Sequence, residues 1–217
     1  MEKITENNII INDHMLNEDD KLINYKSLLT NMLSIQQKYF EINSKNKLFK
    51  KTQKFDCAKY VADNLDLDKM IEAAVFILPG KNVIFIDYLI FKIFAHQDNY
   101  ERIINHIMNL FDYAIKYYGS FEVNLNLRLF TVSAVERYIP PISNFCKRCL
   151  SHHTNYTEHM NFFRILNTPL VMEMIITIVK PFVEKDVICK LTFLSKDDSK
   201  KYCTETNFFL LSDCIQK

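Results

Sequence analysis

Residues 156–194 decide the fold and read YTEHMNFFRILNTPLVMEMIITIVKPFVEKDVICKLTFL. Residues 161–166 predict a strand, residues 169–183 a helix that starts at a proline, and residues 187–194 another strand. A strand, a crossover helix and a second strand form the unit from which parallel sheets are built. The stretch therefore predicts a parallel pair of strands with one apolar helix between them.

The segments before this unit extend the pattern. Residues 121–129 alternate apolar and polar side chains, as half-buried strands do. Residues 73–86 predict a hairpin around Pro79-Gly80, and a helix that follows Asp98 is expected to end at Gly119. Strands that alternate with helices predict an α/β fold.

A further helix is expected over residues 131–150, interrupted near Pro140-Pro141 because proline lacks the helical N–H donor. Residues 1–17 are polar and predict a flexible tail. From Glu18 an amphipathic helix begins, and a lysine-rich stretch follows it over residues 44–54. That stretch is interpreted either as a solvated linker or as a basic lip that touches anionic lipid.

Composition narrows the class of protein. The chain has 217 residues, a net charge of +1 and 48% hydrophobic residues, which is typical of a globular domain and gives no global attraction to nucleic acid. It holds no run of about 20 apolar residues and no signal-peptide core, so we expect a cytoplasmic protein, peripheral at most to membranes. The six cysteines are expected to be thiols.

Several motifs of the opening stretch together resemble the CRAL-TRIO (Sec14-like) family of lipid-binding domains. They are Tyr156-x-Glu158, the strand that ends in Asn167-x-Pro169, Lys180-Pro181-Phe182, and Lys190 before the last strand. A looser similarity reaches back to about residue 70. There Asn126 and Leu129 stand where the family has an acidic residue and a glycine. The family's Gly-Arg-Pro before its first strand and its Leu-Pro-x-x-x-Gly-Gly after the last strand are both missing.

The resemblance implies a mixed, mostly parallel sheet flanked by helices, with an apolar ligand cavity under a gate helix. It implies a lipid-binding domain over residues 55–217, preceded by a helical segment and basic linker over residues 18–54. Helix 169–183 is apolar on nearly every side, so it is interpreted either as a plain core helix or as the gate. The residues expected to line the cavity or form the gate are Phe85, Tyr88, Phe91, Phe94, Leu125, Leu127, Met172, Ile175, Ile176 and Val179.

Glu158 and Lys190 are the polar candidates. In family members that bind phosphatidylinositol, the residues at these positions meet the inositol phosphate headgroup, which implies the same role here. A lysine suits a phosphate because it carries a compact charge with three donors. The alternative is that both are ordinary surface charges.

Other chemistries are disfavoured. Cys146 and Cys149, followed by His152 and His153, lack the second ligand pair of a structural zinc site, so no metal is expected. The chain has no Gly-x-Ser-x-Gly, no His-Glu-x-x-His and only two glycines, which excludes a glycine-rich phosphate loop. We therefore expect a protein that is not an enzyme, has no cofactor and does not bind nucleic acid.

The leading hypothesis is the binding, and transfer between membranes, of a phosphoinositide-like phospholipid or another small hydrophobic ligand. Transient contact with a membrane surface would accompany transfer. The alternative is a protein-interaction module that keeps the fold with a filled cavity. An open apolar cavity would favour lipid, and a filled core would favour a protein partner.

Overall fold

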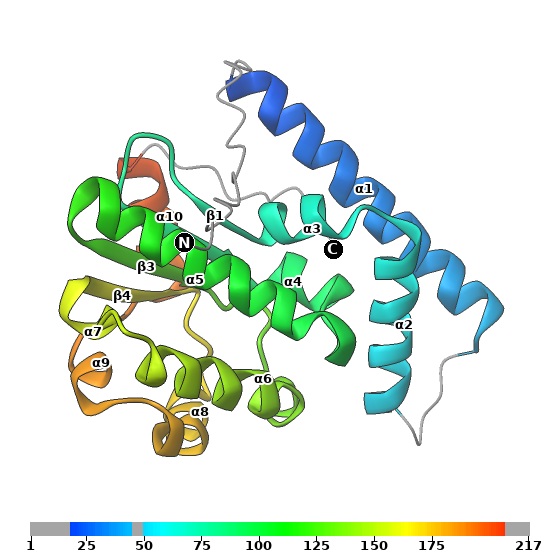
Figure 1. The fold of residues 1–217 in the computed structure, drawn as a ribbon. Coiled ribbons are helices and arrows are strands. Elements are labelled where there is room, and N and C mark those ends of the chain that lie inside the picture. Colours follow the sequence, from blue (N-terminus) through cyan, green and yellow to red (C-terminus); the bar gives the residue numbers. More distant parts are fainter. Residues whose placement is uncertain (1–17, 45–49, 207–217) are drawn as a thin grey trace, which may run out of the picture.

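A computed structural model of the chain describes residues 18–44 and 50–206. The tail expected over residues 1–17 lies outside this part. The described chain runs through five strands and a larger set of helices, which Figure 1 shows coloured along the sequence.

The five strands form one sheet whose spatial order follows the chain, β1-β2-β3-β4-β5. The strands are β1 (Val75–Ile77), β2 (Val83–Asp87), β3 (Phe121–Asn126), β4 (Met160–Leu166) and β5 (Leu191–Phe193). β1 and β2 form the expected antiparallel hairpin, and every later pair is parallel. The prediction of a mostly parallel α/β sheet is thus confirmed.

The connections between the parallel strands cover one face of the sheet, here called the helix face. They are α4 (Tyr88–Phe94), η1 (Gln97–Asn99), α5 (Tyr100–Tyr118), α6 (Val132–Ser151), α7 (Tyr156–His159), α8 (Met172–Val179), η2 (Lys180–Phe182) and α9 (Lys185–Cys189). Gly119 ends α5 in the left-handed conformation with φ 76°, as expected of a glycine just past a helix. The opposite face, here called the α10 face, packs against α10 (Lys196–Glu205). Figure 1 shows α5 in front of the sheet and α10 behind it.

The amino-terminal helices extend the helix-face core. They are α1 (Glu18–Ile42), α2 (Lys50–Asn64) and α3 (Leu67–Ala74). Leu29 and Met32 of α1 and Val61 of α2 are buried in the same apolar cluster as the sheet. The second half of the lysine-rich stretch, from Lys50, is therefore helical rather than an extended linker.

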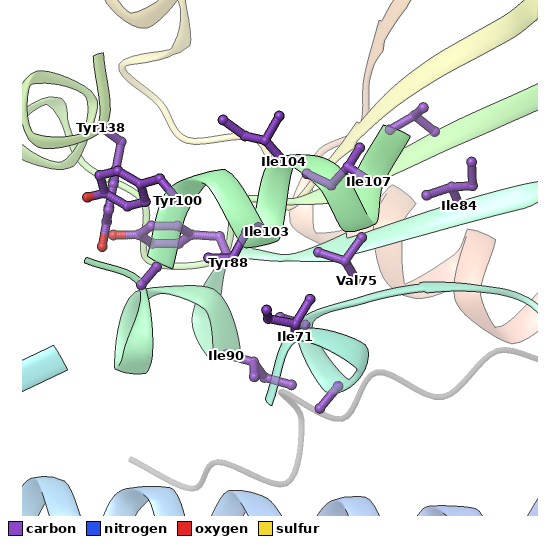
Figure 2. Packing of buried hydrophobic residues seen from close by; sticks show 14 of the residues in the cluster. Ile71, Val75, Ile84, Tyr88, Ile90, Tyr100, Ile103, Ile104, Ile107 and Tyr138 are labelled. Carbon is purple, nitrogen blue, oxygen red and sulfur yellow. The ribbon is translucent and has the colours of Figure 1, made fainter. Parts of the chain in front are cut away.

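That cluster is the main core of the molecule, and Figure 2 shows part of it. Ile84 of the sheet and Ile103, Ile104 and Ile107 of α5 are nearly inaccessible to solvent. Burying an aliphatic side chain of this size stabilises a fold by about 1.5–3 kcal/mol. The core therefore holds the helices against one face of the sheet.

Four details differ from the sequence-based expectations. β3 ends at Asn126 rather than at residue 129, because Leu129 takes a left-handed φ of 61° that a strand does not allow. The helix expected to be interrupted at Pro140-Pro141 runs through both residues. The next helix starts at Met172 rather than at Pro169, and residues 187–189 belong to α9 rather than to a strand. The last strand is consequently only three residues long.

Candidate functional site

The candidate site is the apolar layer of the helix face, between the crossover helices and the sheet, and nine of the ten expected residues belong to it. α8 packs against α6 in one part of this layer, and α4 packs against α1, α2, α3 and β3 in another. Tyr88, Phe94, Leu127, Met172 and Ile175 are buried, and the partly buried side chains of Phe91, Leu125, Ile176 and Val179 pack against the same cluster. They come from α4, from the end of β3 and from α8, which the parallel topology brings together on the helix face.

Phe85 departs from the expectation. It packs on the α10 face with Leu166 and Cys203. Successive residues of a strand point to opposite faces, and Ile84 already faces the helices. Phe85 therefore lies across the sheet from the other nine residues.

α8 is less buried than an all-round apolar helix predicts. Met172 and Ile175 are 9% and 3% exposed, but Met174 is 54% exposed, and Leu170 just before the helix is fully exposed. In the described part of the chain no other helix or strand covers this outer side. The solvent side of the helix carries Met174 together with the exposed polar residues Glu173 and Thr177, and the exposed Leu170 and Val171 lie just before the helix.

The layer beneath α8 is closely packed. Ile175 of α8 has almost no accessible surface, and Phe94 of α4, a helix that packs mainly against α1, α2 and α3, has none. Two surface hollows lie elsewhere, one along α10 and one between α1 and α2, and none of the ten expected lining residues lines either of them. A ligand that enters the layer must therefore displace side chains or move α8.

Glu158 and Lys190 are not joined to each other by an ion pair within the described chain. The Lys190 ammonium donates to the backbone carbonyls of Thr157 and Met160, at 2.5 and 2.6 Å. Glu158 is exposed and accepts a hydrogen bond from the Asn155 amide at 2.7 Å. In this conformation Lys190 ties α9 to α7 and β4, and Glu158 supports the turn before α7.

Tyr156, the first residue of the Tyr-x-Glu motif, has a structural role. It is 5% exposed, its hydroxyl donates to Asp112 at 2.9 Å, and its ring stacks on His152 with centroids 4.7 Å apart. Burial, and then the bond to Asp112, raises the pKa of this phenol well above its usual range. Tyr156 thus stays protonated and holds α7 against α5.

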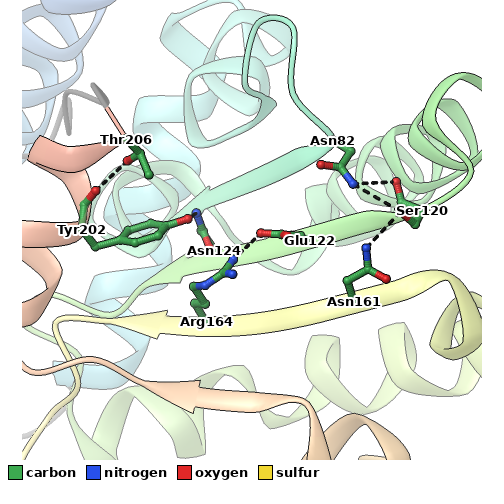
Figure 3. Close-up of polar contacts among 8 residues, drawn as sticks. All are labelled: Asn82, Ser120, Glu122, Asn124, Asn161, Arg164, Tyr202 and Thr206. Atoms are coloured by element: carbon green, nitrogen blue, oxygen red, sulfur yellow. Dashed lines mark hydrogen bonds and ion pairs between the residues drawn. The ribbon is translucent and has the colours of Figure 1, made fainter.

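The α10 face carries a polar network instead of an apolar layer (Figure 3). Arg164 of β4 forms an ion pair with Glu122 of β3, and both side chains are about one-fifth exposed. The buried Asn124 amide donates to the Tyr202 hydroxyl of α10 at 3.1 Å. The alternation of apolar and polar residues over 121–129 predicted that one side of β3 is polar. It did not predict that α10 covers that side.

Cys146 and Cys149 lie half-buried in α6. Burial raises the pKa of Cys146 to about 11 and that of Cys149 to about 12, so both stay protonated and unreactive near neutral pH. Among the described residues, no group of three or more His, Cys, Asp or Glu side chains is arranged to hold a metal ion.

A group of polar residues that the sequence analysis did not single out lies beside the layer. Tyr138 of α6 packs edge-on against Phe91, Tyr88 and Tyr100, with ring centroids 5.2, 6.2 and 6.3 Å apart. Arg137, the preceding residue, is only 8% exposed. Helical spacing could have indicated that Arg137 is buried, because it lies in α6 three residues after Ala134, on the side of the helix that faces the core.

The architecture is that of an α/β ligand-binding domain. Its sheet is mostly parallel, helices cover one face, and a half-exposed helix borders the apolar layer. The family model described as the CRAL/TRIO domain matches residues 80–208, which is more than half of the chain. The chain therefore belongs to the CRAL/TRIO family, as its motifs indicated, and this family generally binds small hydrophobic molecules. A search of curated proteins finds no match to this chain.

Within the described residues, no helix combines the length and the apolar character needed to cross a bilayer.

Proposed function

We propose that this domain binds one small hydrophobic ligand in the apolar layer beneath α8 and that α8 moves outward to admit it. The observation that carries the proposal is a group of exposed apolar residues, Leu170, Val171 and Met174, at the start of a helix that otherwise packs on the core. Its inner side, Met172 and Ile175, joins the core, while Met174 on its outer side is exposed. An exposed apolar side is costly in a helix that never moves and useful in one that exchanges between a core and a lipid surface.

Native mass spectrometry of the gently purified protein tests ligand binding directly. We expect a mass shift from a bound lipid, or uptake of one lipid per chain after incubation with mixed-lipid vesicles. A chain that carries no lipid and accepts none from vesicles would refute the proposal.

Membrane contact through the outer side of α8 is a separate part of the proposal. Met174→Glu places a charge on that side without touching the buried residues, so vesicle association and lipid transfer should fall while the fold is kept. Tyr117→Glu, at an exposed aromatic residue of α5, is the matched control and should leave both unchanged. Equal losses in the two variants would contradict a role for α8.

A phosphoinositide headgroup at Glu158 and Lys190 is the finer form of the proposal. To bind a phosphate, Lys190 must exchange its two carbonyl acceptors for the ligand, which is feasible because its ammonium is only partly buried. Lys190→Ala should then reduce transfer of phosphatidylinositol. Unchanged transfer would remove Lys190 from the headgroup site.

The close packing of the layer supports the alternative of a protein-interaction module. If the layer never opens, the apolar outer side of α8 is left as a surface for a protein partner. Hydrogen exchange distinguishes the two cases. Faster exchange of the α8 amides when lipid vesicles are added favours ligand entry, and unchanged exchange favours the alternative.

A further inference from the structure

The guanidinium of Arg137 is a buried cation without an acidic partner. Arg137 is 8% exposed, and no ion pair joins it to a carboxylate anywhere in the described chain. Its Nε atom is inaccessible to solvent and has no hydrogen-bond acceptor. The guanidinium carbon lies 5.4 Å from the ring centroid of Tyr138, and the guanidinium also forms a hydrogen bond with the Tyr138 side chain. Arginine is almost never buried unpaired, because the charge loses its hydration without compensation.

A second unsatisfied donor lies in the same group. The Tyr100 hydroxyl is buried and has no hydrogen-bond partner. Burial raises the pKa of Tyr100 and of Tyr88 far above the usual range, and Arg137 opposes the rise in both. Both phenols are therefore protonated donors close enough to Arg137 to feel its charge. Figure 2 shows Tyr88, Tyr100 and Tyr138 gathered at the same end of α5.

The surrounding charge is positive. Lys92 of α4 lies over the Tyr88 ring at 5.6 Å, and burial followed by the charges of Lys54 and Arg137 lowers its pKa. Asp87, the one carboxylate that acts on Lys92 in the opposite direction, already accepts the Leu89 amide as the cap of α4. Arg137 and Lys92 bring two cations to the group and Asp87 one carboxylate, so the net charge of these three residues is positive and favours an anion.

This group adjoins the proposed ligand layer directly. Tyr88 and Phe91, two of the expected lining residues, touch the ring of Tyr138. α8 packs against α6, and Ala134 and Val135 of α6 belong to the same apolar cluster as Met172 and Ile175 of α8. A ligand beneath α8 therefore reaches Arg137 by extending along α6, without crossing the sheet.

We propose that Arg137, with the Tyr100 hydroxyl, receives the anionic end of an amphiphilic ligand whose apolar body lies beneath α8. This inference rests on the proposed function and names its ligand class: a single hydrocarbon body that ends in a carboxylate or a phosphate. Guanidinium and phenol groups donate well to either anion, and here the Arg137 Nε atom and the Tyr100 hydroxyl are buried without a hydrogen-bond partner. Charge-assisted hydrogen bonds in such a setting are the strong ones.

The proposal makes an unusual prediction for the free protein. Arg137→Met removes an uncompensated buried charge and keeps the apolar volume, so the Tm of the lipid-free protein should rise by about 2–4 °C. A purely structural arginine would give a lower Tm instead. Arg102→Met, at an exposed arginine of α5 paired with Asp68, is the matched control and should not raise the Tm.

Binding is measured by titrating lipid-free protein with oleic acid, oleoyl lysophosphatidic acid and oleyl alcohol. In the wild type we expect at least one of the two acids to bind tighter than the alcohol, and the tighter one identifies carboxylate or phosphate. Arg137→Met should weaken binding of that acid at least about 30-fold and leave the alcohol unchanged. Arg137→Lys should retain part of the preference, and Tyr100→Phe should weaken binding of the acid about 3–10-fold.

Three outcomes would overturn the proposal in distinguishable ways. If the acids and the alcohol bind equally in the wild type and in Arg137→Met, the anion site fails while the proposed function stands. If Arg137→Met raises the Tm without changing selectivity, the unsatisfied donors hold an ordered water only. If none of the three ligands binds, the proposed function fails and this inference fails with it.

Discussion

The two faces of the sheet share every strand but differ in how they are covered. The helix face carries a continuous apolar cluster under the crossover helices, whereas the α10 face carries a small apolar group and the polar contacts of Glu122, Asn124 and Arg164. The difference follows from the winding, because the connections between parallel strands return over the same face. The apolar burial that stabilises the fold and the proposed ligand site therefore lie on one side of the sheet, while α10 is fixed to the other side by specific polar pairs.

The largest expected effect tests the helix face. Phe94→Ala removes a ring with no accessible surface and should lower the free energy of unfolding by about 3–5 kcal/mol. Phe162→Ala, on the α10 face and 46% exposed, should cost less than about 1 kcal/mol. Urea unfolding measures both. Equal costs would mean that the two faces are not energetically distinct.

The next effect tests the ion pair of the α10 face. Glu122→Gln leaves Arg164 partly buried without its partner, and we expect a loss of about 1.5–3 kcal/mol. The double variant Glu122→Gln with Arg164→Met should recover part of that loss, because no unpaired charge remains. A double variant less stable than either single one would show that the pair is not the source.

A smaller effect is expected where α10 docks on the sheet. Tyr202→Phe removes the acceptor of the buried Asn124 amide and should cost about 1 kcal/mol, measured as a fall in Tm. Tyr117→Phe, at an exposed ring, is the control and should cost nothing measurable. Indistinguishable Tm values for Tyr202→Phe and wild type would show that water replaces the lost hydroxyl.

The smallest effect has the opposite sign and lies in the turn after β3, the central strand of the sheet. Leu129 is 58% exposed at φ 61°, so Leu129→Gly should relieve strain and raise the free energy of unfolding by about 0.5–1 kcal/mol. Leu129→Ala keeps the Cβ atom and should bring no gain. A gain with alanine would locate the benefit in the lost exposed side chain instead.

Much of the helix face could be predicted, because periodicity and motifs act locally. The hairpin at Gly80, the end of α5 at Gly119 and the apolar face of β3 all follow from short-range rules. The family motif also indicated that residue 129 is a glycine position, and the left-handed φ of Leu129 gives the physical reason.

What could not be predicted depends on tertiary contacts. Nothing local shows that Lys190 bonds to the carbonyls of Thr157 and Met160, or that Arg137 is buried among tyrosines from three helices. The position of Phe85 on the far face required the strand register, which pairs Phe85 with Asn124. Charge and hydropathy by themselves do not reveal which neighbours a folded chain brings together.

The strand order, which follows the chain from β1 to β5, has a consequence for synthesis. Each strand pairs with the strand made just before it, so no part of the sheet waits for a distant segment to complete it. Domains that assemble from the amino terminus can begin to fold while the ribosome is still adding residues. The sheet is therefore finished last at its β5 edge, where the three residues 191–193 and then α10 close it.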